Sequence, residues 1–353
     1  MQHKSAIIGY GSMAAWQVRY IRDNKITDIL LPKGAFDIRP EALKKAEEDG
    51  LYAYKSLDEL LADKEIDVVY IAAPNHVHAE LSIKAMRSGK NVICEKPVAM
   101  NAAELEEIIK VRDETGKLFT VHHNRRWDND FRAVKEIVES GMIGKPDFIE
   151  SRVEGPDKFF HGWRDSKANG GGMLRDWGVH LIDQVMWIMK EKVVSVFSEQ
   201  MGIHTQEVDD TSKTIICFEN GTSAQIELLM GACLKIPRFR LMGKLGTVIV
   251  DSINGEGKII KLVPDADVKW AEDIIFTAAG PTRTMAPRPS HTINETPLPD
   301  VKFNQYDIYF NIINAIEGKE ELVVKPEECL RVLKVIELAF KSSEEGRSIA
   351  CEI

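Results

Sequence analysis

The sequence predicts an α/β protein in two parts: a parallel sheet with helices on both faces, followed by an α+β part with a large, mostly antiparallel open sheet. Two observations support this. Over the first third of the chain, short apolar strands without polar alternation, such as residues 68–73, are separated by amphipathic helices, as in parallel sheets covered on both faces. After Val121, strand-like runs follow one another directly, which indicates antiparallel pairing. We place the boundary between residues 1–122 and residues 123–353.

The elements of the first part alternate between strand and helix. Pro32 and Gly34 interrupt the second strand, so we expect it to be irregular in its middle. The predicted strands cover residues 5–8, 29–36, 68–73, 91–94 and 118–121, and the predicted helices cover 14–21, 40–49, 78–88 and 103–115.

The second part begins with a helix and continues mainly as strands. The dipeptide Asn220-Gly221 separates two strand-like runs and predicts a hairpin turn. The predicted strands cover residues 147–153, 193–200, 212–218, 223–230, 239–242 and 247–250, and the predicted helices cover 129–140, 304–316 and 326–343. Residues 264–300 are rich in Pro, Thr and Ala, so we expect a functional or oligomer-contacting loop, whose Arg283 and Arg288 could reach an acidic substrate.

Composition narrows the class of protein. The chain has 353 residues, 44% hydrophobic and 29% charged, as in a soluble globular protein with room for two cores. No apolar stretch is long enough to span a membrane, and the charged start is unlike a secretory signal. The net charge of −9 disfavours nucleic acid or an anionic membrane as the main partner. The five cysteines are scattered without a Cys-x-x-Cys pair, so we expect a reducing, cytoplasmic location.

A dinucleotide-binding turn is predicted between the first strand and the first helix. Its residues are Gly9, Tyr10, Gly11, Ser12, Met13 and Ala14. In this pattern Gly9 permits the tight turn, Gly11 lets a pyrophosphate approach the backbone, and Ala14 keeps the helix close to the sheet. The helix N-terminus then faces the phosphates. The alternative is a glycine turn without a ligand, but the position of the motif on the first strand–helix turn favours NAD or NADP as cofactor.

Asp37 ends the second strand, where a ribose-binding carboxylate is expected. A carboxylate there accepts hydrogen bonds from the ribose hydroxyls and repels a 2′-phosphate, which favours NAD. Arg39 lies two residues on and could serve that phosphate, so NADP remains open. Asp37 could also be an ordinary turn or capping residue.

The loop after the third strand should border the cofactor crevice. It contains Ala73, Pro74, Asn75 and His78, and we expect Asn75 or His78 to cap the following helix. His76 and His78 have the spacing of metal ligands, but no third ligand is apparent. The pair at 122–123 is similarly ambiguous, and we predict no metal site.

Two distant segments carry the predicted chemistry. Glu95 and Lys96 follow a buried strand, whereas Asp176 and His180 lie where a glycine-rich loop leads into a helix. A lysine, an aspartate and a histidine brought together could remove a hydroxyl proton while a cofactor takes the hydride. Lys96 could hydrogen-bond the reacting oxygen, and His180, near a positive helix end, would act as a neutral general base. Asp176 could orient the substrate or balance these cations.

Neighbouring side chains are suited to a polyhydroxylated ring. Asn124 and Arg125 start the second part at the mouth of the cleft, and Trp163 and Arg164 flank the glycine-rich loop with Trp177. Tryptophans more often simply pack. Asp183, one turn after His180, could either contact the substrate or cap the local loop.

These landmarks resemble those of the glucose–fructose oxidoreductase / inositol dehydrogenase / rhizopine-catabolism (Gfo/Idh/MocA) family. The similarity extends along nearly the whole chain, through the glycine turn, residues 73–76, 95–97, 124–127 and 171–183, and the closing helix from Pro326. The resemblance implies an N-terminal Rossmann domain, a C-terminal domain with an open antiparallel sheet, and NAD(P)-dependent chemistry at a carbinol carbon of a sugar, inositol or sugar derivative. It also implies that Lys96, Asp176 and His180 occupy the catalytic positions.

Three functions are compatible with these features, and the sequence favours a sugar or polyol dehydrogenase. The family resemblance also includes redox-assisted glycoside hydrolases, which would retain a tightly bound cofactor without net NADH production. A non-catalytic NAD-binding sensor would tolerate loss of Lys96 and His180, and both are present. The runs 215–218 and 226–230 are apolar on both strand faces, so we expect a homodimer or homotetramer formed through the C-terminal sheet.

Overall fold

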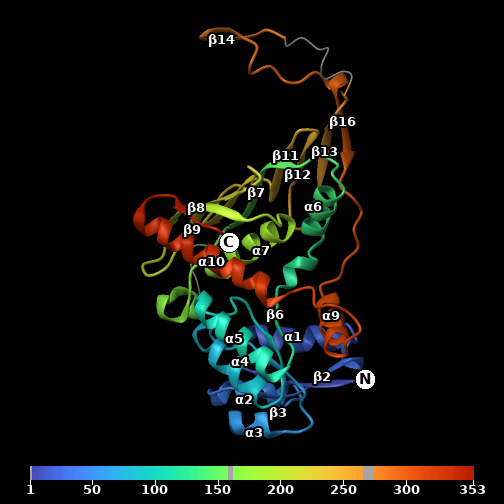
Figure 1. Cartoon of the computed structure of the whole chain (residues 1–353), viewed down its shortest axis with the longest axis vertical. Coiled ribbons are helices and arrows are strands. Elements are labelled where there is room, and N and C mark those ends of the chain that lie inside the picture. Colours follow the sequence, from blue (N-terminus) through green and yellow to red (C-terminus); the bar gives the residue numbers. More distant parts are fainter. Residues whose placement is uncertain (1, 158–161, 265–272) are drawn as a thin grey trace.

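The chain forms two sheets in separate parts, and residues 273–292 lie in a narrow arm that projects from the second (Figure 1). The structure is a computed structural model that describes residues 2–157, 162–264 and 273–353. No described helix combines the length and the apolar character needed to cross a membrane.

The first sheet has six parallel strands in the order β3-β2-β1-β4-β5-β6. This is the order of a doubly wound dinucleotide-binding domain, whose ligands bind at the carboxyl ends of the strands beside the point where strand order reverses. The strands are β1 His3–Ile8, β2 Leu30–Phe36, β3 Tyr52–Ala53, β4 Val68–Ile71, β5 Asn91–Cys94 and β6 Phe119–Val121, and the helices are α1 Ser12–Asp23, α2 Pro40–Glu48, α3 Leu57–Ala62, α4 His78–Arg87 and α5 Ala102–Thr115. The predicted parallel sheet is confirmed, whereas β3 and α3 were not predicted.

Strand β2 is irregular in its middle, as expected. Its register with β1 shifts between Ser5 and Ala6, so Lys33 has no partner in that pairing. Gly34 is required by space, because a Cβ atom there would lie 2.5 Å from the Tyr54 ring. The bulge turns Lys33 toward the segment that precedes β4.

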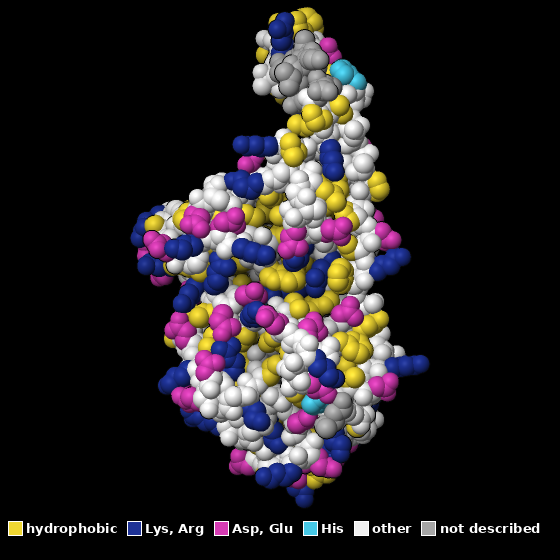
Figure 2. Space-filling view, turned by 45° about the vertical axis from the view of Figure 1, so that its right-hand side comes forward, with side chains coloured by type: hydrophobic (Ala, Val, Ile, Leu, Met, Phe, Trp, Pro, Cys, Tyr) yellow, Lys and Arg dark blue, Asp and Glu magenta, His cyan; other side chains and the backbone are white. Residues whose placement is uncertain are grey.

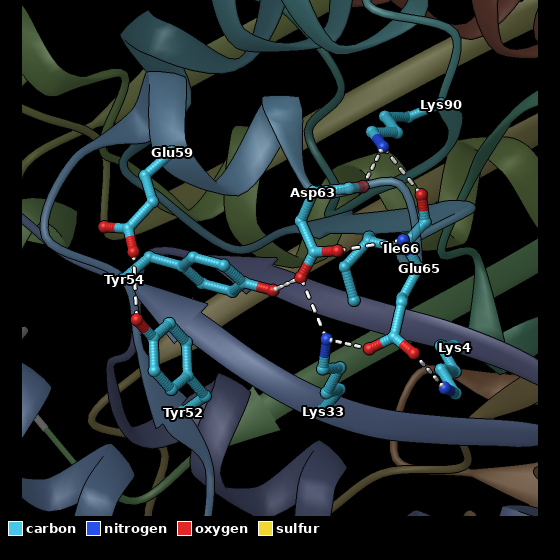
Figure 3. Close-up of polar contacts among 9 residues, drawn as sticks. All are labelled: Lys4, Lys33, Tyr52, Tyr54, Glu59, Asp63, Glu65, Ile66 and Lys90. Atoms are coloured by element: carbon cyan, nitrogen blue, oxygen red, sulfur yellow. Dashed lines mark hydrogen bonds and ion pairs between the residues drawn. The ribbon is translucent and has the colours of Figure 1, made fainter.

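A polar network surrounds that bulge near the amino ends of the strands (Figure 3). Lys33 Nζ donates to Asp63 Oδ2 at 2.9 Å and also pairs with Glu65. The Tyr54 hydroxyl donates to the same Asp63 oxygen at 2.7 Å. Lys90 is only 5% exposed, and its ammonium group donates to the main-chain oxygens of Asp63 and Ile66. These contacts fix the turn between α3 and β4.

The second sheet has nine strands in the order β16-β13-β12-β11-β7-β10-β9-β8-β17. Only the β7–β10 pair is parallel among the pairings of these strands, so the predicted mostly antiparallel sheet is confirmed. The strands are β7 Pro146–Gly155, β8 Val193–Met201, β9 Thr211–Phe218, β10 Ser223–Met230, β11 Phe239–Gly243, β12 Gly246–Val250, β13 Gly257–Leu262, β16 Ile293–Pro297 and β17 Ile349–Ala350, and the helices are α6 Asn129–Glu139, α7 Val179–Ile188, α9 Asp307–Ile316 and α10 Pro326–Glu345.

The two faces of this sheet differ in burial. Ile216 on β9 and Ile226 and Leu228 on β10 are at most 1% exposed, because α7 and α10 pack against their face. Ile215 on the opposite face is 36% exposed, and Met242 of β11 is 44% exposed. In a single chain one face of the sheet is therefore open.

The segment 264–300 contains more regular structure than its composition predicts. Strands β14 Ile275–Thr277 and β15 Gly280–Thr282 form a hairpin, and β16 extends the main sheet beside β13. Residues 265–272 lie outside the described part. The hairpin belongs to the arm, and Figure 2 shows hydrophobic side chains toward its outer end. Phe276 is 81% exposed there.

The last helices return to the first sheet. The Tyr309 hydroxyl on α9 donates to Gln17 of α1, and Thr120 Oγ1 on the edge strand β6 donates to the Val324 oxygen at 2.9 Å. Helix α10 also packs against α5 and β6 as well as β8. The C-terminal segment thus covers the outer edge of the N-terminal sheet.

Candidate active site

The glycine turn leaves open space in front of α1. Gly9 has φ 88°, and a Cβ atom there would lie 2.7 Å from the Ala73 nitrogen. By contrast, a Cβ atom on Gly11 would meet nothing within 4 Å. Ser12 and Met13 in the first helical turn are exposed, whereas Ala14 is completely buried against the sheet. A helix N-terminus with free space before it suits the pyrophosphate of a dinucleotide.

Asp37 lies at the carboxyl end of β2, next to the same turn. Its carboxylate is 6% exposed, accepts the Tyr10 amide at 2.8 Å and forms two hydrogen bonds with the Arg39 guanidinium. Although burial opposes ionisation, these bonds lower the pKa of Asp37 below its usual value. Tyr10 is buried, and its hydroxyl donates to Asp49 Oδ2 at 2.7 Å.

The loop that contains Ala73 and Pro74 joins the two parts instead of capping a helix. Asn75 Nδ2 donates to the Gly170 oxygen at 3.0 Å, and the fully buried His78 ring lies 2.7 Å from the Ala73 oxygen and 2.9 Å from the Pro97 oxygen. No side-chain cap is found at α4, so the capping expectation for Asn75 and His78 was wrong. Both side chains instead bond to main-chain oxygens outside α4.

Lys96 and Asp176 meet across the two parts of the molecule. Lys96 Nζ donates to Asp176 Oδ1 and to the Asp176 main-chain oxygen, both at 2.7 Å. The Arg164 guanidinium donates to the other carboxylate oxygen at 2.9 Å. Burial raises the pKa of Asp176, but the charges of Lys96 and Arg164 outweigh it, so the pKa is lowered overall. The carboxylate therefore stays ionised between two cations.

His180 lies on the first turn of α7 and is 4% exposed. Burial, followed by the charge of Lys96, holds the pKa of His180 well below its usual value, so the ring is neutral near neutral pH. Its Nδ1 atom has no hydrogen-bond partner in the described part of the chain. The ring contacts His123 and Trp177, with centroids 5.7 and 6.0 Å away.

The glycine-rich loop before α7 packs so closely against its neighbours that it has no room for side chains at two of its glycines. A Cβ atom on Gly171 would lie 2.2 Å from the Arg164 oxygen, and one on Gly172, which has φ 101°, would lie 2.2 Å from Asp209 Oδ1. Asp209 Oδ2 accepts the Leu174 amide at 2.7 Å. Asp209 was not predicted from the sequence, because this contact joins residues 35 positions apart and has no local pattern.

The predicted substrate residues flank His180 and Asp176. The Arg125 guanidinium lies 4.2 Å from the Trp177 ring centroid and donates to Asp128 at 2.9 Å. Arg164 lies 4.6 Å from the centroid of the partly buried Trp163 ring. Asn124 is partly buried in the short helix Asn124–Trp127. Arg283 and Arg288 lie in the arm, which stands away from these residues within one chain (Figure 1).

Asp183 pairs with a distant arginine and does not cap the local loop. It is 2% exposed and forms a two-bond ion pair with Arg126, at 2.7 and 2.8 Å. Its Oδ2 atom also lies 3.8 Å from His123 Nδ1. Asp183 therefore lies in the core next to the His123 ring, which in turn packs against His180.

Glu95 also turns inward. Its carboxylate accepts the Tyr70 hydroxyl, pairs with His122 at 3.2 Å and accepts the Lys96 amide at 3.3 Å. Despite burial, these contacts lower the pKa of Glu95 to about 2. Gln17 Nε2 lies 3.4 Å from His122 Nδ1. A buried glutamine within the apolar stripe of α1 was the available sequence signal for this network. No group of three potential metal ligands occurs among the described residues.

Two family models match the chain. The model described as "Oxidoreductase family, NAD-binding Rossmann fold" matches residues 3–123, and the "GFO/IDH/MocA C-terminal domain" model matches residues 131–249. The chain belongs to the Gfo/Idh/MocA oxidoreductase family. It is therefore an NAD(P)-dependent oxidoreductase with a Rossmann domain, as the resemblance implied.

Individual relatives cover most of the chain. The crystal structure of an NAD-binding protein from Listeria innocua is 38% identical in sequence, matches over 99% of both chains and superposes with a TM-score of 0.94. A scyllo-inositol 2-dehydrogenase (NADP(+)) from Bacillus subtilis is 29% identical, and the match covers 89% of this chain and 87% of the Bacillus protein. An uncharacterised oxidoreductase from Schizosaccharomyces pombe is also 29% identical, with 85% of each chain covered.

Proposed function

We propose that this enzyme transfers a hydride between NAD(P) and a carbinol carbon of a sugar, an inositol or a sugar derivative. The observation that carries the proposal is the contact of Lys96 with Asp176 beside a buried, neutral His180. A donor, a carboxylate and a base thus converge where the carboxyl end of the first sheet meets α7. The inositol dehydrogenase among the relatives supports the choice of substrate class.

The residues of the first part fit the cofactor. The turn from Gly9 to Ala14 would hold the pyrophosphate, Asp37 with Arg39 would hold the adenosine ribose, and residues 73–78 with Glu95 would border the nicotinamide side. The open space before Gly11 supports this placement. When bound, the nicotinamide supplies the hydride acceptor for alcohol oxidation.

Lys96 and His180 divide the proton chemistry. The Lys96 ammonium hydrogen-bonds the substrate oxygen and stabilises the negative charge that develops there as the hydroxyl proton leaves. Neutral His180 accepts that proton at its imidazole nitrogen. Asp176 holds Lys96 in place and balances its charge, and Arg164 fixes the carboxylate from the other side.

Four further side chains would bind the substrate ring. Arg125 and Arg164 each combine a guanidinium with a nearby tryptophan face, a pairing suited to hydroxyl groups on one side and C–H surface on the other. Trp163 and Asn124 complete the set. This arrangement supports a polyhydroxylated ring more than a flat aromatic substrate.

A panel of inositols, neutral sugars and sugar acids, assayed with NAD and NADP for NADH or NADPH formation, tests the proposal. We expect turnover with at least one polyol or sugar. Cleavage of a glycoside without net NADH formation would instead identify the redox-assisted hydrolase, and failure of the whole panel at saturating cofactor would contradict the substrate class.

We further propose that NAD is preferred over NADP, since the Asp37 carboxylate repels a 2′-phosphate. The preference should decrease in Asp37→Ser and persist in Arg39→Ala, because in the second variant the carboxylate remains. The ratio of kcat/KM values for the two cofactors measures it. Better efficiency with NADP in the unaltered enzyme would contradict the assignment and implicate Arg39.

The proposal includes assembly and location. The open face of the second sheet, with Ile215 and Met242 partly exposed, supports a homodimer or homotetramer. Light scattering at micromolar concentration would contradict it by giving a monomer mass. The five cysteines are all free, which supports a cytoplasmic location. We retain residues 1–122 as the cofactor domain and 123–353 as the substrate and assembly domain.

A further inference from the structure

A hollow of about 370 Å³ lies apart from Lys96 and His180, between α7, the start of α10 and residues 321–325. This volume falls within the range of small-molecule sites, which are about 300–1,000 Å³. Its apolar wall contains Met186, Leu322 and Val332. Four cationic and three acidic side chains also line it, so the positive groups outnumber the negative ones.

The four cations that line the hollow differ in whether a carboxylate pairs with them. Arg126 is bound by Asp183 and Glu328, and Lys325 is bound by Glu321. Arg331 donates to the main-chain oxygens of Glu191 and Ile353. Lys190, just beyond the end of α7, is exposed and has no ion-pair partner within the described ranges. Lys190 and Arg331 are thus the cations that a ligand could bind without first breaking a side-chain ion pair.

A second observation concerns the surroundings of Trp187, which lines the same hollow. Three cations lie over its ring, Arg126, Arg132 and Lys135, at 4.7, 5.0 and 4.8 Å from the centroid. Arg132 Nε is buried without a hydrogen-bond partner among the described residues, and burial together with repulsion from Arg126 lowers the pKa of Arg132 to about 10. Arg126 is compensated by Asp183 and Glu328, and Lys135 by Glu139. Arg132, which does not itself line the hollow, is therefore the cation of this group without an ion pair among the described residues, and an anion bound nearby would stabilise it.

The backbone adds little to this preference. Helix α10 begins at Pro326, directly beside the hollow, but its first turn carries Glu327 and Glu328, which offset the partial positive charge of the helix N-terminus. The cations that lack a side-chain ion pair, Lys190 and Arg331, therefore carry the preference for a negatively charged ligand.

We propose that this hollow binds a small molecule bearing a phosphate or carboxylate group, with Lys190 and Arg331 as its main ligands. Met186, Leu322 and Val332 would contact the uncharged part of that molecule. The site is separate from the pyrophosphate-binding turn and does not depend on the identity of the substrate.

The test uses the full chain saturated with NAD, so that the dinucleotide site is already filled. Inorganic phosphate and citrate are titrated separately by calorimetry at constant ionic strength. We expect saturable binding of at least one probe, weakened about tenfold by Lys190→Glu and by Arg331→Gln, since a hydrogen bond to a charged group is worth about that factor. The stronger probe shows whether phosphate or carboxylate is preferred.

Lys244→Glu provides the matched control, because this exposed lysine in the β11–β12 turn carries the same charge change far from the hollow. Its affinity should equal that of the unaltered protein. The proposal is overturned if neither probe binds saturably, if Lys190→Glu leaves affinity unchanged, or if Lys190→Glu and Lys244→Glu weaken binding equally. Lys190 is exposed, so its replacement leaves the fold intact and keeps the comparison valid.

Discussion

The two ends of the six-stranded sheet contrast in how their polar groups are used. At the amino end, Lys33 and Tyr54 both donate to Asp63, and the Lys90 ammonium donates to two carbonyl oxygens (Figure 3). At the carboxyl end, buried ring nitrogens of the histidines at 122, 123 and 180 have no hydrogen-bond partner in the described chain. The same sheet therefore has one end that stabilises the fold and one that leaves groups available for chemistry.

This contrast shows how burial has opposite consequences in the two places. Around Lys33, Asp63 and Lys90 at the amino end, buried polar atoms are matched and hold a turn in place, although Nε2 of His3 on β1 lacks a hydrogen-bond partner among the described residues. At the carboxyl end, burial keeps the imidazole of His180 neutral beside the Lys96 ammonium, and this state is required of a base. Substitutions at the two ends should therefore separate turnover from stability.

The largest separation is expected from His180→Ala. Removing the base should lower turnover by about 10²–10⁴-fold, the usual contribution of positioned proton transfer, while NAD affinity changes little. Steady-state kinetics and NAD titration measure the two quantities. Near-normal turnover on the true substrate would assign the base to another residue, with Asp176 the next candidate.

The next effect is a pH dependence at the glycine-rich loop. Burial raises the pKa of Asp209 to about 7 from a usual value of 3.8. The folded protein therefore holds a proton that the unfolded chain releases, and stability falls as pH rises through this interval. Relative to Asp209→Asn, the free energy of unfolding of the unaltered protein should fall by about 2–4 kcal/mol between about pH 4 and pH 7. Urea denaturation at several pH values measures it, and a constant difference would show that the folded carboxyl is ionised throughout.

A smaller effect is expected at the amino end. Lys90→Met leaves two main-chain oxygens without their donor, so it should cost about 1–3 kcal/mol of stability and leave turnover unchanged. Denaturant unfolding and steady-state kinetics on the same samples test both halves. A loss of turnover in a fully folded sample would remove the distinction between the two ends.

The smallest effect should come from Lys33→Ala. Lys33 is about one-third exposed and its partner Glu65 more so, and ion pairs of this kind are worth about 0–1 kcal/mol. The loss should shrink further in high salt, because ions screen exposed pairs. A loss above that of Lys90→Met would mean that the bulge in β2, not the burial of Lys90, sustains this end of the sheet.

Local sequence patterns predicted the turns, strands and helices whose formation depends on residues close together in the sequence. The glycine turn, the buried strand of residues 68–71 and the hairpin at Asn220-Gly221 each contain the signal that forms them. The parallel sheet then follows from the alternation of strands and helices. Even the irregularity of β2 was visible in Pro32 and Gly34.

Long-range contacts were beyond the same patterns. Asp183 finds Arg126 at a separation of 57 positions, and Asn75 finds Gly170 at 95. Strands β13 and β16 escaped prediction because lysines interrupt the first and the second contains only one large apolar residue, Ile293. The tertiary setting, not local preference, decides such elements.

The return of the last helices to the first sheet bears on how the chain is made. Strand β6 is an edge strand, and its Thr120 is bonded to Val324, while Gln17 of α1 is bonded to Tyr309. During synthesis, the first 122 residues leave the ribosome long before these partners exist. The six-stranded sheet therefore keeps an unprotected edge until residues 309–324 have been made, and early termination would release a fragment prone to pair with other chains.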